Sequence, residues 1–134
     1  MQAPVQSPII PGSIITLPWL NYFNNLSQPT PTPVPYVGAW GDFGGAFETG
    51  KYYLDNVASR VYLQGLIVRT GASGVGEIIF TLPVGYRPAG DILLACTATG
   101  AFANIKIVAA SGSVIFNVGS AITNCSLSGL NFRI

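Results

Sequence analysis

The side chains that could carry out chemistry in this 134-residue chain are few. The sequence contains no histidine, which excludes Ser–His and Cys–His nucleophilic sites and histidine-ligated metals. Five carboxylates remain: Asp42, Glu48, Asp55, Glu77 and Asp91. Asp42 and Glu48 flank Gly44-Gly45 in an expected loop, which could present both to a glycosidic bond. We expect instead that the five are solvated charges of loops and strand ends.

Two other patterns fall short of a cofactor or metal site. The glycine-rich stretch 71–76 lacks the Lys-Ser/Thr ending of a phosphate-binding loop, and no helix is expected after it. No loop clusters the oxygen ligands that a hard cation prefers. Cys96 and Cys125 each lie in an apolar segment, which favours buried free thiols, with a single disulfide as the alternative. We therefore predict a protein that is not an enzyme and needs no cofactor or metal.

The overall composition poses a solubility problem. Only 8% of the residues are charged, 49% are hydrophobic, and the mean hydropathy is +0.48. A net charge of +1 offers no attraction for nucleic acid or an anionic membrane. We find no apolar run of membrane-spanning length, and no basic segment followed by an apolar core that would predict a signal peptide. A monomer of this kind would be short of surface charge, so we expect much of its exterior to be covered.

The chain divides by composition into an arm, residues 1–37, and a body, residues 38–134. Eight of the ten prolines lie in residues 1–35, and no charged residue precedes Asp42. Fifteen of the 16 glycines lie between Gly38 and Gly129. The alternating prolines of residues 29–35 predict an extended polyproline II spacer.

One short helix is expected in the arm, within residues 17–26. Pro18 suits a first helical turn, and helical spacing then puts Trp19, Phe23 and Leu26 on one face. So short a helix needs a surface to dock on, either its own body or a different subunit or protein. We favour the second alternative, with an anchor made by Trp19, Tyr22, Phe23 and Leu26.

The body is predicted to be all-β, because short apolar runs alternate with glycine turns. We expect strands at residues 51–54, 60–69, 77–82, 91–97, 103–109, 113–118 and 125–134, the last broken by Gly129. Residues 110–112 predict a hairpin turn. About seven short strands without an amphipathic helix indicate an antiparallel β-sandwich of the jelly-roll kind.

Several aromatic residues fall in the expected loops of this sandwich: Trp40, Phe43, Phe47, Tyr86 and Phe102. Such rings either cover the open ends of the sandwich or stack on a sugar or fill a partner's pocket. Arg87 could likewise hydrogen-bond a glycan or clamp its own tight loop. The candidate ligand or partner contacts are Trp40, Phe43, Tyr86, Arg87 and Phe102.

The segment 81–88, Thr-Leu-Pro-Val-Gly-Tyr-Arg-Pro, resembles part of a small β domain common in tailed-bacteriophage virion proteins. That domain often forms the head of tail-fibre or receptor-binding chains. Flanking motifs extend the resemblance over residues 38–134: Gly41 and Gly44-Gly45, Tyr52-Tyr53, residues 61–66, the hairpin around Gly112 with Val114, and residues 127–132.

The resemblance implies a homotrimeric, β-rich virion protein that is made in the host cytoplasm and is not an enzyme. In the family the domain usually ends a long fibre, whereas here it is nearly the whole chain, so we expect the arm to do the attaching. Extended, the arm could reach about 110 Å. We therefore expect a short tail-appendage or fibre-head protein that is attached by its arm to other virion proteins of the tail, neck or capsid. Its exposed end is expected to contact a host-surface saccharide or an adjoining fibre. The alternatives are a capsid decoration protein and, far behind it, a polysaccharide depolymerase fragment.

Overall fold

The computed structural model describes residues 30–71, 75–99, 101–118 and 124–134, and this part of the chain is built from strands. The eleven strands are β1 (Thr32–Pro33), β2 (Trp40–Asp42), β3 (Lys51–Asp55), β4 (Arg60–Gln64), β5 (Leu66–Arg69), β6 (Ile78–Thr81), β7 (Ile92–Ala98), β8 (Ala101–Ile107), β9 (Ser113–Val118), β10 (Asn124–Ser126) and β11 (Asn131–Arg133). The predicted all-β class is confirmed. The described residues contain no helix that could span a membrane. The short helix expected within residues 17–26 lies outside them.

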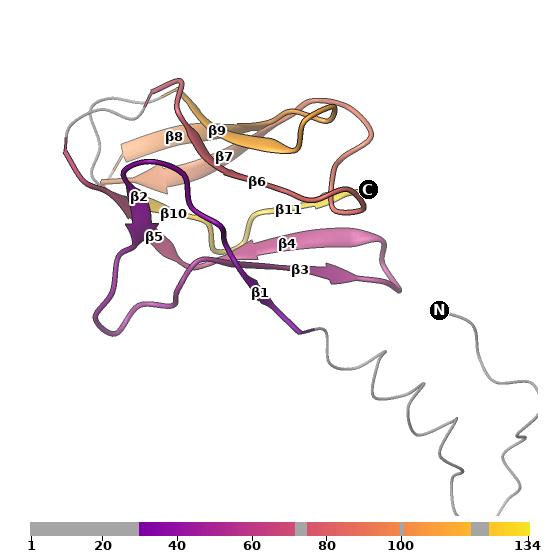
Figure 1. The fold of residues 1–134 in the computed structure, drawn as a ribbon, viewed down its shortest axis with the longest axis horizontal. Helices are drawn as coiled ribbons and strands as arrows, with labels where there is room; N and C mark the ends of the chain where they lie inside the picture. The colour runs from indigo at the N-terminus through magenta and orange to yellow at the C-terminus, as the bar shows by residue number, and fades with distance from the viewer. Residues whose placement is uncertain (1–29, 72–74, 100, 119–123) are drawn as a thin grey trace, which may run out of the picture.

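The strands form three antiparallel sheets that make a two-layered sandwich. Sheet A has the order β1-β3-β4-β11, sheet B the order β6-β9-β8-β7, and sheet C the order β10-β5-β2. Sheet B forms one side of the molecule, whereas β3, β4 and β11 lie across from it and β2, β5 and β10 lie at one end (Figure 1).

Sheets A and C are joined where the chain continues from β4 into β5 and from β10 into β11. Residues 60–69, expected as one strand, divide at Gly65 into β4 of sheet A and β5 of sheet C. Gly65 has φ +106°, and a Cβ there would lie 2.4 Å from the Thr49 carbonyl oxygen. Only glycine accepts this bend, which corrects the single-strand prediction. The run from β10 to β11 makes the matching passage, with Gly129 between them as expected.

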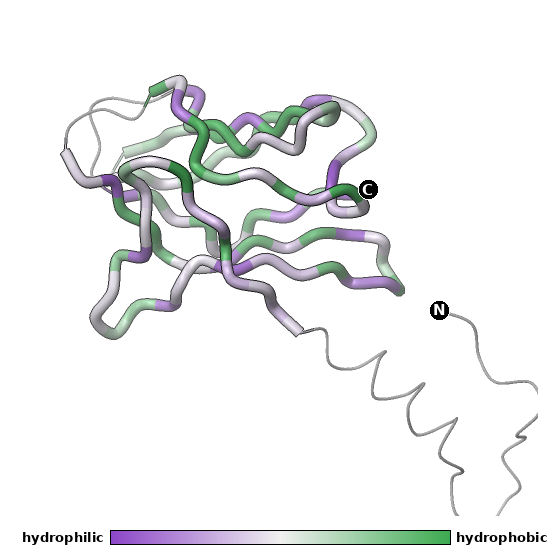
Figure 2. The backbone as a smooth tube through the Cα atoms, viewed as in Figure 1, coloured by the Kyte–Doolittle hydropathy of each residue, from purple (hydrophilic) through white to green (hydrophobic). Residues whose placement is uncertain are grey.

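The core fills the space between the two layers. Alternation along β4 buries Val61 and Leu63, and alternation along β8 buries Ile105 and Ile107. Apolar residues recur in this way along the strands of both layers (Figure 2). In β6 a bulge breaks the alternation, so that the consecutive residues Ile79 and Phe80 are both buried.

Part of the predicted polyproline spacer belongs to the body. Thr32 and Pro33 pair with Tyr52 and Lys51 of β3, and Val34 is buried in the core. The Val34 amide donates to the Gly50 carbonyl at 3.0 Å. The prolines are tolerated because β1 is an edge strand. Residues 32–34 are therefore strand and core, not spacer.

Candidate partner-binding surfaces

Asp42 and Asp55 accept hydrogen bonds from backbone amides of nearby loops. The Oδ1 of Asp42 accepts hydrogen bonds from the Tyr36 hydroxyl at 2.5 Å and from the Gly50 amide at 2.7 Å. Burial and then this contact with Asp42 raise the pKa of Tyr36, so the phenol remains a donor. The Oδ1 of Asp55 accepts the Val57 amide at 2.9 Å in the turn after β3.

Two further carboxylates form ion pairs. Arg69 and Glu77 make two side-chain bonds of 2.6 Å, and the hydrogen bond from Arg69 lowers the pKa of Glu77. The Asp91 carboxylate accepts the Ala109 amide at 2.9 Å and lies 3.3 Å from Lys106 Nζ. The amide bond, and then Lys106, lower the pKa of Asp91. These carboxylates fix strands and turns, which corrects the expectation of merely solvated charges. Within the described residues, no three His, Cys, Asp or Glu side chains are grouped to hold a metal ion.

The loop that carries the family-like motif, residues 81–88, is a clamp between elements. Arg87 Nε donates to the Leu82 carbonyl at 3.0 Å, and its Nη1 donates to the Ala110 carbonyl at 2.8 Å. The Tyr86 ring is half-buried and packs edge-on against Tyr52 of sheet A, with centroids 5.3 Å apart. Of the two sequence interpretations of Arg87, the structure supports the clamp.

Trp40 is placed differently from the sequence expectation. It belongs to strand β2 and not to a loop, its side chain is only 5% exposed, and its ring lies 6.2 Å from that of Phe116. Alternation along β2 points it into the core. Trp40 is therefore a packing residue, and the expectation of a surface contact there is wrong.

Phe43 occupies a loop, as expected. Its ring packs edge-on against Phe47 at 5.2 Å, and both rings are exposed. The Phe43 amide donates to the Leu66 carbonyl at 3.0 Å, which fixes the start of this loop. The pair forms a small apolar knob between β2 and β3.

Phe102 is exposed, but it lies on strand β8 and not in a loop. Its side chain is 90% exposed, and it pairs with Thr97 of β7. Leu93 lies on the same face of β7 as Thr97 and is 62% exposed. We call the outward surface of sheet B the sheet-B face. The cross-strand register places these residues on it: Ile78, Ile115, Lys106, Leu93, Asn104, Ala95, Phe102 and Thr97. Its one charged side chain, Lys106, is paired with Asp91.

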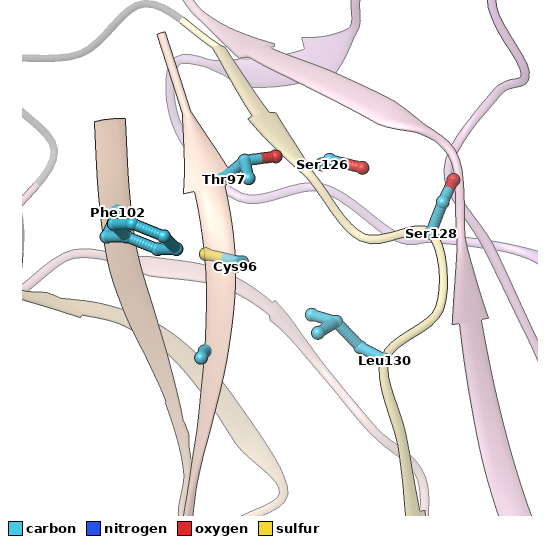
Figure 3. Close-up of a pocket in the computed structure, with 7 residues that line it drawn as sticks. Cys96, Thr97, Phe102, Ser126, Ser128 and Leu130 are labelled. Atoms are coloured by element: carbon cyan, nitrogen blue, oxygen red, sulfur yellow. The ribbon is translucent and has the colours of Figure 1, made fainter. Parts of the chain in front are cut away.

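A shallow hollow of about 210 Å³ lies between β7 and the segment from β10 to β11 (Figure 3). Its lining is Ala95, Cys96, Thr97, Phe102, Ser126, Ser128 and Leu130. Leu130 points from its segment toward β7. Cys96 is one of the lining residues and is 7% exposed.

The outward face of sheet A is polar and aromatic. Tyr53 and Tyr62 stack with centroids 5.1 Å apart and an interplanar angle of 10°. Beside them, the Nε and Nη2 of Arg60 donate to Asn131 Oδ1 at 2.9 and 2.6 Å. The outward members of this sheet-A face are Lys51, Tyr53, Asp55, Arg60, Tyr62, Gln64, Asn131 and Arg133. Along β4, Arg60, Tyr62 and Gln64 alternate with the buried Val61 and Leu63, and this alternation is the sequence signal for the face.

Comparison with solved structures finds this architecture in a bacteriophage protein. The crystal structure of the receptor binding protein (gp15) of Listeria phage PSA superposes with a TM-score of 0.66 at 21% identity. The match covers 84% of this chain and 69% of that one. The two chains share a fold. The resemblance inferred from residues 81–88 is thus confirmed at the level of fold. No protein-family model and no curated protein matches the sequence.

Proposed function

We propose that this protein is a phage virion component, a short trimeric tail appendage or fibre head that contacts the host surface or an adjoining fibre. The observation that carries the proposal is the fold shared with a phage receptor-binding protein over 84% of the chain. The carboxylates favour a structural role over a glycosidase, because four of the five bind backbone amides or basic side chains of the protein itself.

The sheet-B face is the surface proposed to meet sister subunits. It exposes Phe102 and Leu93, and its one lysine is already neutralised by Asp91. Second copies of the chain suit this surface, since a threefold assembly hides the same apolar patch on every subunit.

The sheet-A face is the surface proposed to remain outside and to contact a saccharide. The Tyr53 and Tyr62 rings offer apolar edges with hydroxyls at their tips. The bond to Asn131 holds the Arg60 guanidinium in one orientation, which leaves donors in a fixed geometry for sugar hydroxyls. Lys51 and Arg133 add charge that would be costly to bury in a subunit interface.

The arm is the proposed attachment to the virion, through Trp19, Tyr22, Phe23 and Leu26. These residues lie outside the described part of the chain. Their support is the sequence pattern, an uncharged segment with three aromatic residues that is unlike a solvated linker.

Sedimentation analysis of the full chain tests the assembly. We expect a trimer for the wild type and dissociation for the double variant Leu93→Ser/Phe102→Ser. The matched control is Val57→Ser/Val84→Ser, which changes two similarly exposed residues that lie in loops and not on the strands of sheet B. A monomeric wild type, or a double variant that stays trimeric, would refute this interface.

Binding to host cells and to a glycan array tests the outward face. Tyr53→Ala/Tyr62→Ala should lose binding while Phe43→Ala keeps it; equal loss or equal retention would exclude the sheet-A face as the contact. A density map of the whole particle tests the position. Density at the tail supports the proposal, whereas copies spread over the head shell would replace it with capsid decoration.

A further inference from the structure

Two buried cysteines lie next to each other although their strands belong to different sheets. Cys96 lies on β7, at the edge of sheet B, and Cys125 lies on β10, at the edge of sheet C. Both are free thiols, and their Sγ atoms are 3.4 Å apart. Near them, the Thr99 amide donates to Asn124 Oδ1 at 3.1 Å, so a hydrogen bond already joins the ends of the two strands.

We propose that Cys96 and Cys125 form an oxidation site, at which a peroxide converts the two thiols into a disulfide that staples sheet B to sheet C. The Sγ atoms must approach from 3.4 Å to about 2.05 Å, a change within the range of side-chain rotation. The bond would link residues that are 29 positions apart in the chain.

The two cysteines have unequal roles in this reaction. Cys96 lines the hollow beside Phe102, whereas Cys125 is fully buried. The hydrogen bond from Cys125 lowers the pKa of the Cys96 thiol, and the same bond together with burial raises the pKa of Cys125. The sulfur of the cysteine that lines the hollow is thus the better thiolate, and the sulfur of the fully buried cysteine keeps its proton.

The chemistry follows from that difference. The Cys96 thiolate attacks one oxygen of hydrogen peroxide, the O–O bond breaks, and Cys96 becomes a sulfenic acid. The hydroxide that leaves takes up the proton released from Cys96 and becomes water. The Cys125 sulfur then attacks Cys96 Sγ, its proton leaves with the sulfenic hydroxyl as a second water, and the S–S bond forms. One peroxide is reduced by two electrons, and the two thiols supply them.

The test uses the full chain, purified under reductant, freed of it, and treated with hydrogen peroxide. We expect intact-mass analysis to show a loss of about 2 Da, with peptide mapping to Cys96–Cys125 within one chain. The melting temperature should rise by roughly 10 °C and return on reduction. Persistence of both free thiols, or bridges only between chains, would overturn the proposal.

Two variants test the order of the steps in the presence of dimedone, which traps sulfenic acids. Cys125→Ser should yield a dimedone adduct on Cys96, because no second thiol remains to resolve it. Cys96→Ser should leave Cys125 unmodified, because it is enclosed. An adduct on Cys125 and none on Cys96 would overturn the assigned roles. Should either variant fail to fold, the peptide map of the wild type still decides whether the bridge forms.

Discussion

Arg87 donates a hydrogen bond of 2.8 Å to the carbonyl of Ala110, which lies 23 positions later in the chain. Its other bond, of 3.0 Å, goes to the carbonyl of Leu82. One guanidinium therefore ties the loop after β6 to the turn between β8 and β9. A Cβ at Gly112 would lie 2.6 Å from Arg87 Nε, so a glycine there leaves room for the clamp.

Removal of this clamp should destabilise the fold. We expect Arg87→Ala to lower the free energy of unfolding by about 2 kcal/mol, because two carbonyls lose a charged donor. Urea unfolding measures the change. Arg133→Ala is the matched control, since the Arg133 side chain forms no hydrogen bond or ion pair among the described residues; it should change stability by less than about 0.5 kcal/mol. Equal effects of the two variants would contradict the role given to Arg87.

Gly65→Ala should be among the most damaging single changes. The alanine would adopt a strained φ of +106° and place its Cβ against the Thr49 carbonyl. We expect a loss of about 3 kcal/mol or more, or failure to fold. Gly90→Ala is the control, because a Cβ there meets nothing within 4 Å. If Gly65→Ala unfolds at the same denaturant concentration as the wild type, the bend between β4 and β5 does not require glycine.

Stability should depend on pH through Glu77. The pKa of Glu77 is lower in the folded state because of Arg69, so the unfolded chain takes up a proton first as the pH falls. The ion pair therefore contributes fully above the ordinary glutamate range, and its contribution declines as the pH falls through the folded-state pKa. We expect melting curves between pH 6 and about pH 3 to show a smaller acid-induced loss for Glu77→Gln than for the wild type. Arg69→Gln should show the same reduction, and an unchanged profile in both variants would exclude the pair as a source of this pH dependence.

The arm should be required for attachment to the virion. We expect Trp19→Ala/Phe23→Ala in the full chain to reduce incorporation roughly tenfold or more, because two large apolar side chains lose a docking surface. Quantitative blotting of purified particles measures incorporation. Asn21→Ala, on the opposite side of the expected helix, should be neutral. Normal incorporation of the double variant would refute the anchor.

The structure also decides where the arm can be cut. Deletion of residues 1–29 should leave a folded body, whereas deletion of residues 1–37 removes β1 and the buried Val34 and should lower the melting temperature. Circular dichroism of the two truncations measures the difference. Equal melting temperatures would show that β1 contributes nothing to the body.

Local sequence pattern predicted most strands of the described body. Residues 113–118 match β9 at both ends, and the hairpin before them forms as expected. β2 was missed because three residues around a glycine give too short a pattern for alternation to show. Phe102 was predicted to lie in a loop because the expected strand began at residue 103, whereas β8 begins at Ala101. The run from β7 into β8 contains no charged residue near this point that would mark where the strand begins.

The candidate surfaces were predicted less well, because exposure depends on the layer that a strand faces. Trp40 and Phe102 are both large aromatic residues near glycines, yet one is 5% and the other 90% exposed. No local feature separates them. The stacking of Tyr53 on Tyr62 depends likewise on the register between β3 and β4.

By itself, the sequence determined the all-β class, the glycine turns and the shortage of charge, because these depend on residue types and on spacings of a few positions. Only the tertiary structure decided that residues 60–69 divide between two sheets, that Arg87 is a clamp, and that Cys96 and Cys125 meet. Each of these depends on pairing between segments tens of residues apart, where the packing of the whole core selects one register among many. The shortage of charge seen in the composition is found in part on the sheet-B face. Among the residues of that face, only Lys106 is charged, and it is paired with Asp91.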